Sequence, residues 1–245
     1  MNRFTFLLFI IISFDSRSQD KVNEIAEANF AKTQIGINAS LDVGYRLLEN
    51  NFGFGSSIAD TIIEMRNESE IPKIGYTTGL NALFNLKSNF SLETGLQYSN
   101  KGYQTKMTDL IAFQPIDSLM PEKMKSIYNY HYVDVPFRFI YVIGRNKIRF
   151  LMSAGVTANI FIKETHTSVR IYSDRKERNT NPTAIDYKRV NFSPMLSLGI
   201  DYKINREINL RIEPTFRYGV LKIIDAPVSG YLYNGGLNIS CYYSF

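Results

Sequence analysis

The sequence predicts an all-β fold: an eight-stranded antiparallel up-and-down β-barrel that spans a membrane, with short periplasmic turns and long extracellular loops. Three observations indicate it. Eight segments alternate between apolar and small or polar residues, which is the period of a β-strand. Their apolar face carries no Asp, Glu, Lys or Arg, whereas the other face collects charged residues. Short and long connections alternate along the chain, as they do in barrels of this kind.

The first four predicted strands lie at about 33–46, 73–86, 90–105 and 129–143. In the first, Ile, Ala, Leu, Val and Tyr occupy the odd positions, and Gly, Asn, Ser, Asp and Arg the even ones. In the second and third, Ile, Tyr, Leu and Phe alternate with Gly, Thr, Asn, Ser and Glu. In the fourth, Val, Phe and Tyr alternate with Tyr, Asp, Pro and Arg. Each segment therefore has one apolar and one mainly polar face.

The last four predicted strands lie at about 147–163, 188–204, 207–220 and 231–245. Ile, Phe, Leu, Met and Val alternate in the first three with Arg, Ser, Asn, Asp, Glu and Thr. The closing strand alternates Tyr, Leu, Ile and Cys with Asn, Gly and Ser and ends on Phe245. A final aromatic of this kind is the form that the outer-membrane assembly machinery favours, so we expect Phe245 to be an assembly signal.

Three connections are short, and the four between them are long. Binding functions are expected in the long ones, because loops tolerate variation that strands do not. The first long connection is acidic, and in the second Met120–Tyr128 is predicted to form a short helix that starts at Pro121. The short turns lie at about 87–89, 144–146 and 205–206, and the long connections at about 47–72, 106–128, 164–187 and 221–230.

The third long connection is basic. Its cations could bind the phosphates of lipopolysaccharide or an acidic partner; a solvated charged loop is the alternative. The candidates for loop binding are Arg170, Arg175, Lys176 and Arg178.

A bilayer explains the separation of the two faces. A closed antiparallel barrel has no unpaired edge, so it can cross lipid, and the predicted strands reach the 9–11 residues or so that a tilted strand needs. Periodicity alone also fits a soluble eight-stranded barrel of the lipocalin type, apolar inside and polar outside. The uncharged apolar face, the long loops at one end and the aromatic C-terminus favour the outer membrane of the cell, with both ends in the periplasm.

The N-terminus carries an export signal, which divides the chain into three parts. Met1–Arg3 is basic, and Phe4–Phe14 is apolar but shorter than the roughly 20 residues that a membrane-spanning helix needs. Small residues at Ser16 and Ser18 predict cleavage before Gln19; an uncleaved anchor is the alternative. The predicted parts are a signal peptide (1–18), a periplasmic lead with a helical turn near 24–28 (19–32), and the barrel domain (33–245).

Composition excludes several classes of function. The single cysteine, Cys241, rules out an internal disulfide, and a net charge of +5 without a dense basic run gives no nucleic-acid footprint. Gly53–Ser57 lacks the strand–helix setting of a phosphate-binding loop. The two histidines, His131 and His166, are not at metal-ligand spacing. A catalytic role for His131 would need a neighbouring Ser and an acid on the same face, and position 133 is Val. We therefore predict no catalytic residues, no metal site and no cofactor.

The predicted lumen is charged. An eight-stranded barrel is just filled by its inward side chains, so its charges must pair. We expect four acids to meet four arginines across the lumen: Asp134, Glu93, Asp201 and Glu213 with Arg138, Arg149, Arg211 and Arg217. A proton path or a gated small-ion conduit is the alternative role. The predicted network is Asp42, Arg46, Glu93, Asp134, Arg138, Arg149, Asp201, Arg211, Glu213 and Arg217, with Lys101, Lys163 and Lys203 on the same face. Pro136, also inward, is predicted to mark a bulge or a bend.

Three segments resemble one family. HYVDVPFRFIY (His131–Tyr141), SLETGLQYSNKGY (Ser91–Tyr103) and LRIEPTFRYGV (Leu210–Val220) are similar to strands of the PorT-like outer membrane β-barrel family, a porin-like family common in Bacteroidetes. The resemblance covers nearly all of the predicted mature chain. It implies a barrel in which some relatives serve type IX secretion; the N-terminal signature of the secretion component itself is missing.

The expected function is that of a non-enzymatic outer-membrane barrel that engages a partner through its loops or its periplasmic end, with an accessory role in secretion as one version. A conductance or transport barrel is the alternative, and a lipid-active enzyme using His131 is a third hypothesis. Expected partners are outer-membrane lipid and lipopolysaccharide, the barrel assembly machinery, and secretion-system or envelope proteins, but no nucleic acid.

Overall fold

A computed structural model describes residues 33–51, 57–110, 120–183 and 185–244 of the chain. The predicted signal peptide (1–18), the predicted periplasmic lead (19–32) with its helical turn, and Phe245 lie outside the described residues. Eight of the described strands form the barrel: β1 (Thr33–Asn50), β2 (Glu70–Lys87), β3 (Phe90–Thr105), β5 (Lys123–Ile143), β6 (Ile148–Ile171), β8 (Val190–Lys203), β9 (Ile208–Tyr218) and β10 (Val228–Ser244).

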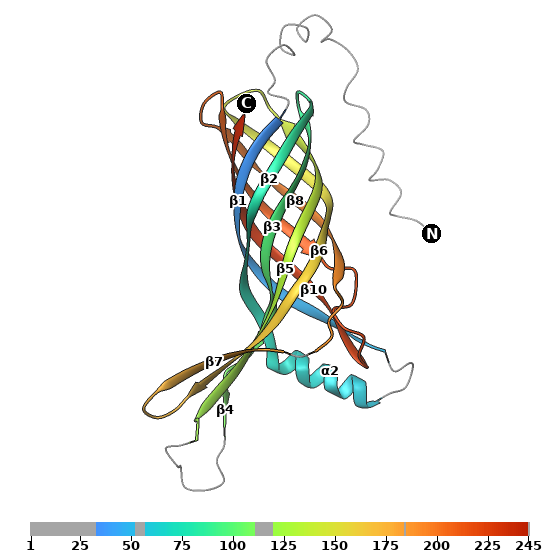
Figure 1. Ribbon diagram of the computed structural model, residues 1–245, viewed down its shortest axis with the longest axis vertical. Helices are drawn as coiled ribbons and strands as arrows, with labels where there is room; N and C mark the ends of the chain where they lie inside the picture. Colours follow the sequence, from blue (N-terminus) through green and yellow to red (C-terminus); the bar gives the residue numbers. More distant parts are fainter. Residues whose placement is uncertain (1–32, 52–56, 111–119, 184, 245) are drawn as a thin grey trace, which may run out of the picture. The chain divides into compact units, whose positions relative to one another are not determined.

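The eight strands close into a ring. Each pairs antiparallel with the next in chain order, and β1 pairs with β10 along their whole lengths, from Gln34 opposite Ser244 to Asn50 opposite Val228. This confirms the predicted eight-stranded antiparallel barrel. The three short turns lie at one end, called here the turn end, and the long connections lie at the other, called the loop end (Figure 1).

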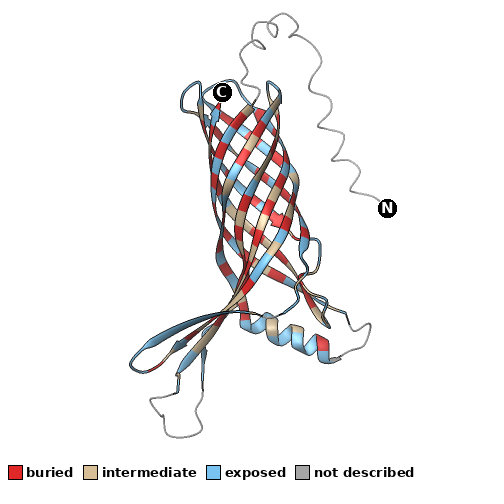
Figure 2. Cartoon of the chain, in the orientation of Figure 1, coloured by how far each residue is buried: buried red, intermediate tan, exposed pale blue. Residues whose placement is uncertain are grey.

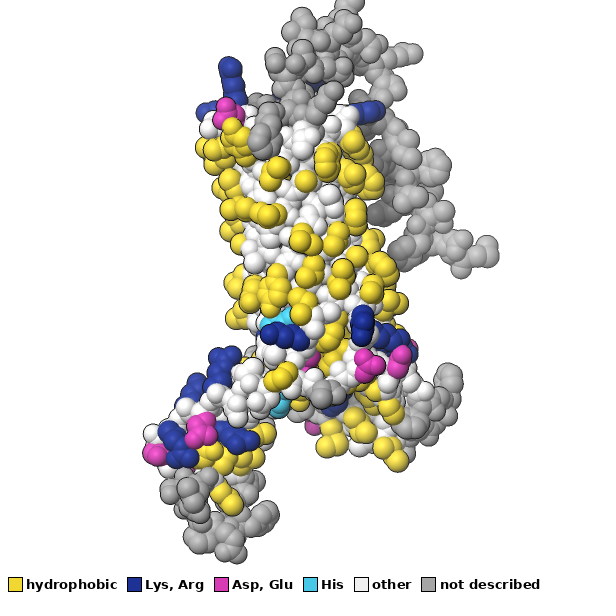
Figure 3. Space-filling view, viewed as in Figure 1, with side chains coloured by type: hydrophobic (Ala, Val, Ile, Leu, Met, Phe, Trp, Pro, Cys, Tyr) yellow, Lys and Arg dark blue, Asp and Glu magenta, His cyan; other side chains and the backbone are white. Residues whose placement is uncertain are grey.

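The side chains alternate between lumen and exterior as predicted. Figure 2 shows buried and exposed residues following one another along each strand, and Figure 3 shows hydrophobic side chains over the visible barrel wall. Ile37 and Leu41 on β1 are 62% and 65% exposed. Asp42, on the same strand, is only 1% exposed; β1 pairs with β2 on one side and with β10 on the other. Among the described residues, no helix is long and apolar enough to span a membrane.

The second long connection is shorter than predicted, because β5 begins at Lys123. The predicted helix at Met120–Tyr128 is therefore wrong. This segment pairs on both sides, with Ile127 opposite Gln104 of β3 and Tyr128 opposite His166 of β6. Two neighbouring strands satisfy its backbone groups, whereas a short isolated helix is marginal in water.

The third long connection is a hairpin, because β6 continues to Ile171 and pairs with β7 (Lys176–Pro182). The start of β5 pairs in turn with the two-residue strand β4 (Thr108–Asp109). The segments Lys123–His131 of β5 and Lys163–Ile171 of β6, with β4 and β7, are called the arm. It diverges sideways from the loop end of the barrel in Figure 1.

The first long connection contains a helix that the sequence analysis missed, α2 (Ser57–Ser69). Ala59 on this helix is 1% exposed, and Arg66 forms an ion pair of 2.7 Å with Glu70 at the start of β2. Asp60 in the first turn and Arg66 in the last complement the helix dipole. The ion pair links the last turn of the helix to the first residue of β2.

The predicted bulge at Pro136 is wrong. Pro136 is opposite Thr157 in an uninterrupted register between β5 and β6. The register shift lies instead between His131, which is opposite Lys163, and Tyr132, which is opposite Phe161. Ile162 of β6 is therefore the extra residue. This bulge reverses the alternation of β6, and Lys163, which was predicted to face the lumen, is exposed.

Candidate functional site

The lumen near the turn end is crossed by one connected charge network. Arg138 donates to Glu93 from Nε at 2.8 Å and from Nη2 at 2.9 Å, and its Nη1 forms a further ion pair with Glu213. Glu93 belongs to β3 and Glu213 to β9, so one guanidinium links two parts of the barrel wall. All three side chains are 3% exposed or less, and a buried charge of this kind requires its partner.

A second group of charges continues this network. Arg149 Nε donates to Asp201 at 2.8 Å, and Arg211 Nε donates to the other oxygen of the same carboxylate at 2.7 Å. The guanidinium of Arg211 lies 4.7 Å from the ring centre of Tyr242, whose hydroxyl donates to Glu93 at 2.6 Å. A tyrosine therefore joins the two groups of ions, a role that the sequence analysis did not assign to Tyr242.

The half of the lumen near the loop end has more dispersed charges. Asp42 accepts from Thr77 at 2.6 Å and lies 3.5 Å from Arg217. Asp134 was expected to pair with an arginine, but it pairs with Lys101 at 3.0 Å and accepts from Asn159 at 2.6 Å. Lys101 is on β3 and Asn159 is on β6, and these two strands are the neighbours of β5. Both side chains therefore lie closer to Asp134 than any arginine does.

Arg46 lies buried near the loop end of the barrel, opposite Leu232 of β10. Its Nε donates to Glu70 at 2.6 Å and its Nη1 to Asn67 of α2 at 2.6 Å. Arg66 donates to the same carboxylate and to Tyr103. Glu70 falls within the predicted acidic connection (47–72), but it is only 7% exposed and pairs with two arginines. No sequence signal marks this role, because it depends on the position of α2.

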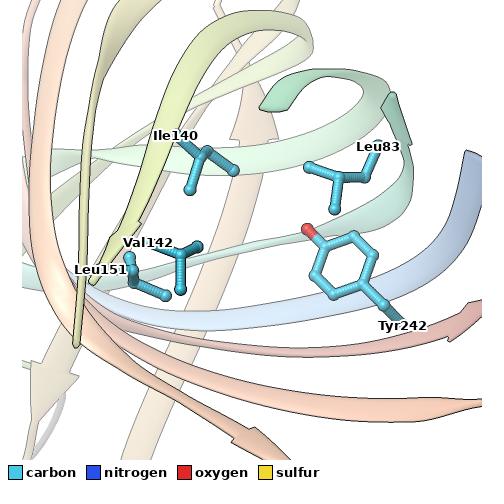
Figure 4. Close-up of a cluster of buried hydrophobic side chains, with 5 residues drawn as sticks. All are labelled: Leu83, Ile140, Val142, Leu151 and Tyr242. Carbon is cyan, nitrogen blue, oxygen red and sulfur yellow. The ribbon is translucent and has the colours of Figure 1, made fainter. Parts of the chain in front are cut away.

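Two apolar clusters lie in the lumen, one near each end, and neither was predicted. Near the turn end, Leu83, Ile140, Val142, Leu151 and Tyr242 pack together (Figure 4). A second cluster, near the loop end, contains Tyr103, Tyr130, Tyr132, Ile223 and Leu232. Apolar residues at inward positions of the strand ends were a signal that could have identified the first cluster. Buried side chains therefore pack together in the lumen near both ends.

The arm separates the four cations predicted for loop binding. Arg170 lies opposite Glu177, while Arg178 lies opposite Val169 and faces the other side of the arm. Arg175 is neutralised: its Nε donates to Glu177 at 2.8 Å, and its guanidinium lies 4.0 Å from the ring centre of Tyr172. This hydrogen bond from Arg175 lowers the pKa of the Glu177 carboxyl.

His131 lies on the outer surface at the base of the arm. Its Nδ1 is 2.5 Å from the Tyr98 hydroxyl and its Nε2 is 3.3 Å from the Thr165 hydroxyl. Tyr98 and Tyr76 form a ring contact beside it, which is typical of the aromatic side chains at a membrane interface. Within the described residues, no group of three or more His, Cys, Asp or Glu side chains could hold a metal ion.

A closed ring of eight strands with an apolar exterior and a charged lumen defines the class: an integral outer-membrane β-barrel protein. The family model for the outer membrane protein beta-barrel domain matches residues 51–225, and the chain belongs to this family. The turn end is therefore the periplasmic end, and the loop end, with α2 and the arm, is extracellular.

Solved outer-membrane barrels are similar in fold. Neisserial surface protein A shares 9% identity over 87% of this chain and 97% of its own, with a TM-score of 0.44. OprG from Pseudomonas aeruginosa shares 10% over 86% and 96%, with a TM-score of 0.45. The protease OmpT from Escherichia coli shares 8% over 87% and 96%, with a TM-score of 0.43. No curated protein matches the chain.

Proposed function

We propose that this protein is a non-enzymatic, non-conducting outer-membrane barrel that binds a partner protein through its extracellular end. The observation that carries the proposal is the contrast between its two parts. The lumen is filled by buried ion pairs and by two apolar clusters, which weighs against a path for ions or solutes. The extracellular end, in contrast, extends strands and a helix well beyond the barrel wall.

The helix α2 supplies a surface suited to a protein partner. Ile58, Ile62 and Met65 follow one another at helical spacing and are 72%, 41% and 64% exposed. Exposed apolar side chains that form a continuous stripe are typical of interaction sites. The stripe belongs to a helix that Arg66 and Glu70 hold against the barrel, so it would be preorganised for binding.

A PorT-like assignment within Bacteroidetes, with an accessory role in type IX secretion, is the finer version of this proposal. It is supported by the segment His131–Tyr141, which forms the central part of β5 and supplies both Asp134 and Arg138 to the lumen. The outer-membrane lipid and the barrel assembly machinery are the partners that any such barrel requires for insertion.

Co-purification of the tagged full chain from native outer membranes in mild detergent, followed by mass spectrometry, tests the proposal. We expect stoichiometric envelope or secretion proteins with the natural chain, and their loss when Ile58, Ile62 and Met65 are all changed to Ser. Ile185→Ser, at an exposed apolar residue outside α2, is the control and should retain them. Recovery of the barrel alone would contradict partner binding, and discrete currents in planar bilayers would contradict a sealed lumen.

A further inference from the structure

The register of the arm places four cations on one of its faces. Lys123 of β5 and Lys176 of β7 lie in one cross-strand row, on either side of Ile171 of β6. Lys125 and Arg178 lie in the next row with the same parity, on either side of Val169. Neighbouring strands are about 4.8 Å apart and alternate residues about 6.7 Å apart. The four Cα atoms therefore mark a rectangle of about 10 by 7 Å, called here the cationic face.

Burial agrees with this placement. Val169 lies between Lys125 and Arg178 and is only 4% exposed, as expected if the aliphatic stems of both long side chains cover it. In the next row of the same face, the hydroxyls of Thr167 and Thr180 are 2.9 Å apart, so side chains of β6 and β7 do meet on this side.

The charges on this face are mostly uncompensated. Lys123 forms an exposed ion pair of 2.9 Å with Asp109, which salt-screened water makes weak. Lys125 donates to the neutral Gln104 at 3.1 Å, and among the residues that the structure describes neither Lys176 nor Arg178 has an ion-pair partner. The opposite face is balanced, because Arg170 there lies across from Glu177.

The cationic face continues the membrane-facing surface of the barrel. Along β5, Lys123 and Lys125 have the same parity as Val133 and Phe137, which point outward in the barrel, and Phe137 is 54% exposed there. In β6, the extra residue Ile162 reverses the alternation, so that Val169 and Ile171 face this side as well. The surface that meets acyl chains in the barrel thus leads into the cations of the arm.

The boundary between these two regions is itself polar and basic. His131 lies opposite the exposed Lys163 at the base of the arm. Figure 3 shows Lys and Arg side chains both where the barrel wall ends and along the arm. The charge therefore begins where the apolar barrel wall ends.

We propose that the cationic face binds the phosphate groups of glycolipid headgroups in the outer leaflet and so holds the arm against the membrane surface. Lys and Arg side chains bind phosphate strongly, and four of them in this array would meet more than one phosphate at once. The inference goes beyond the partner binding proposed above, because it concerns a different surface, the arm, and a different ligand, lipid.

Titration of the purified full chain in mild detergent tests this, with binding measured by native mass spectrometry. The probes are diphosphorylated lipid A, dephosphorylated lipid A and inorganic phosphate. Each basic residue near an anionic surface strengthens binding roughly fivefold, so a neutralised face should bind diphosphorylated lipid A at least tenfold more weakly. The variant is Lys123→Gln, Lys125→Gln, Lys176→Gln and Arg178→Gln together.

A matched variant controls for net charge. It neutralises four exposed cations at the periplasmic turns, and we expect its affinity for diphosphorylated lipid A to equal that of the natural chain. The control changes are Lys87→Gln, Arg145→Gln, Lys147→Gln and Arg206→Gln. An equal loss in both variants would overturn the proposal, because bulk charge would then explain the binding.

Three further results would overturn it: unchanged affinity in the neutralised variant, equal binding of dephosphorylated lipid A, or binding of inorganic phosphate as tight as that of the lipid. Heat-modifiable mobility on gels verifies that each variant is folded. If the fourfold variant does not fold, Lys176→Gln with Arg178→Gln tests the exposed strand β7 alone. The charge-conserving pair, Lys176→Arg with Arg178→Lys, should retain binding. Co-purification of a protein partner is measured separately, so failure of one proposal leaves the other intact.

Discussion

Arg138 on β5 and Glu93 on β3 are directly opposite one another and share two hydrogen bonds, of 2.8 and 2.9 Å, inside a barrel lumen. The same guanidinium also forms an ion pair with Glu213 on β9. A single side chain thus pairs with two buried carboxylates on separate strands. The lumen of this barrel therefore depends on shared partners.

Arg138→Met should destabilise the barrel by roughly 3–5 kcal/mol, because it leaves Glu213 buried without its ion-pair partner and leaves Glu93 with only Arg211, 4.0 Å away. Urea unfolding of the chain in lipid vesicles, followed by circular dichroism, measures this. The control, Lys147→Met at an exposed periplasmic turn, should change the free energy of unfolding by less than about 0.5 kcal/mol. Equal stability of the two variants would mean that the lumen is wet enough to solvate the carboxylates.

Tyr242→Phe should cost about 1.5–3 kcal/mol, since it removes the 2.6 Å hydrogen bond to the charged Glu93 and leaves the ring in place. Tyr141→Phe, on the lipid-facing side of β5, is the control and should have a much smaller effect. The same unfolding measurement applies. A neutral result at Tyr242 would show that the ion pairs with Arg138 and Arg211 satisfy Glu93 without the hydroxyl.

Gly102→Ala should loosen the arm and leave the barrel folded. Gly102 has φ of +143°, and an added Cβ would lie 2.0 Å from the carbonyl oxygen of Tyr128, so β3 and β5 would separate there. We expect faster proteolysis within the arm with unchanged heat-modifiable mobility. In Gly230→Ala, where the nearest atoms are at an ordinary 3.5 Å, proteolysis should be unchanged.

Arg175→Gln should raise the pKa of Glu177 toward the ordinary carboxyl value, because the hydrogen bond from Arg175 is what lowers it. A lowered folded-state pKa stabilises the hairpin above the ordinary carboxyl pKa, and this contribution is lost as the pH falls through the folded-state pKa. NMR titration of the Glu177 carboxyl measures the shift. Arg170→Gln, across from Glu177, should have the smaller effect, and the reverse order would contradict the assignment.

The faces of the strands could be predicted because a bilayer imposes two different environments on one wall. Outward positions must be apolar, whereas charged residues are confined to inward ones, so the period of two in the sequence is enough to orient Ile37, Asp42 or Phe137. The ends of the strands at the three short turns were also predictable. Glu93 and Arg138 could be placed in the lumen for the same reason.

The partners within the lumen could not be read from the sequence. Asp134 was expected to meet one of the inward arginines, yet it meets Lys101, because register decides which side chains are neighbours. The extra residue Ile162 reversed the direction of Lys163 without a signal in composition. A shift of one residue turns every later side chain to the other face.

The sequence by itself determined the class of protein, since the alternation, the uncharged face and the unequal connections all follow from the bilayer. Only the tertiary structure decided the arm, α2 and the cationic face. Their backbone groups lie outside the lipid and have water as an alternative partner, so local sequence left helix, strand and loop close in free energy. Pairing with β3 and β6 made Met120–Tyr128 mainly strand, and that pairing assembled Lys123, Lys125, Lys176 and Arg178 from two separate connections.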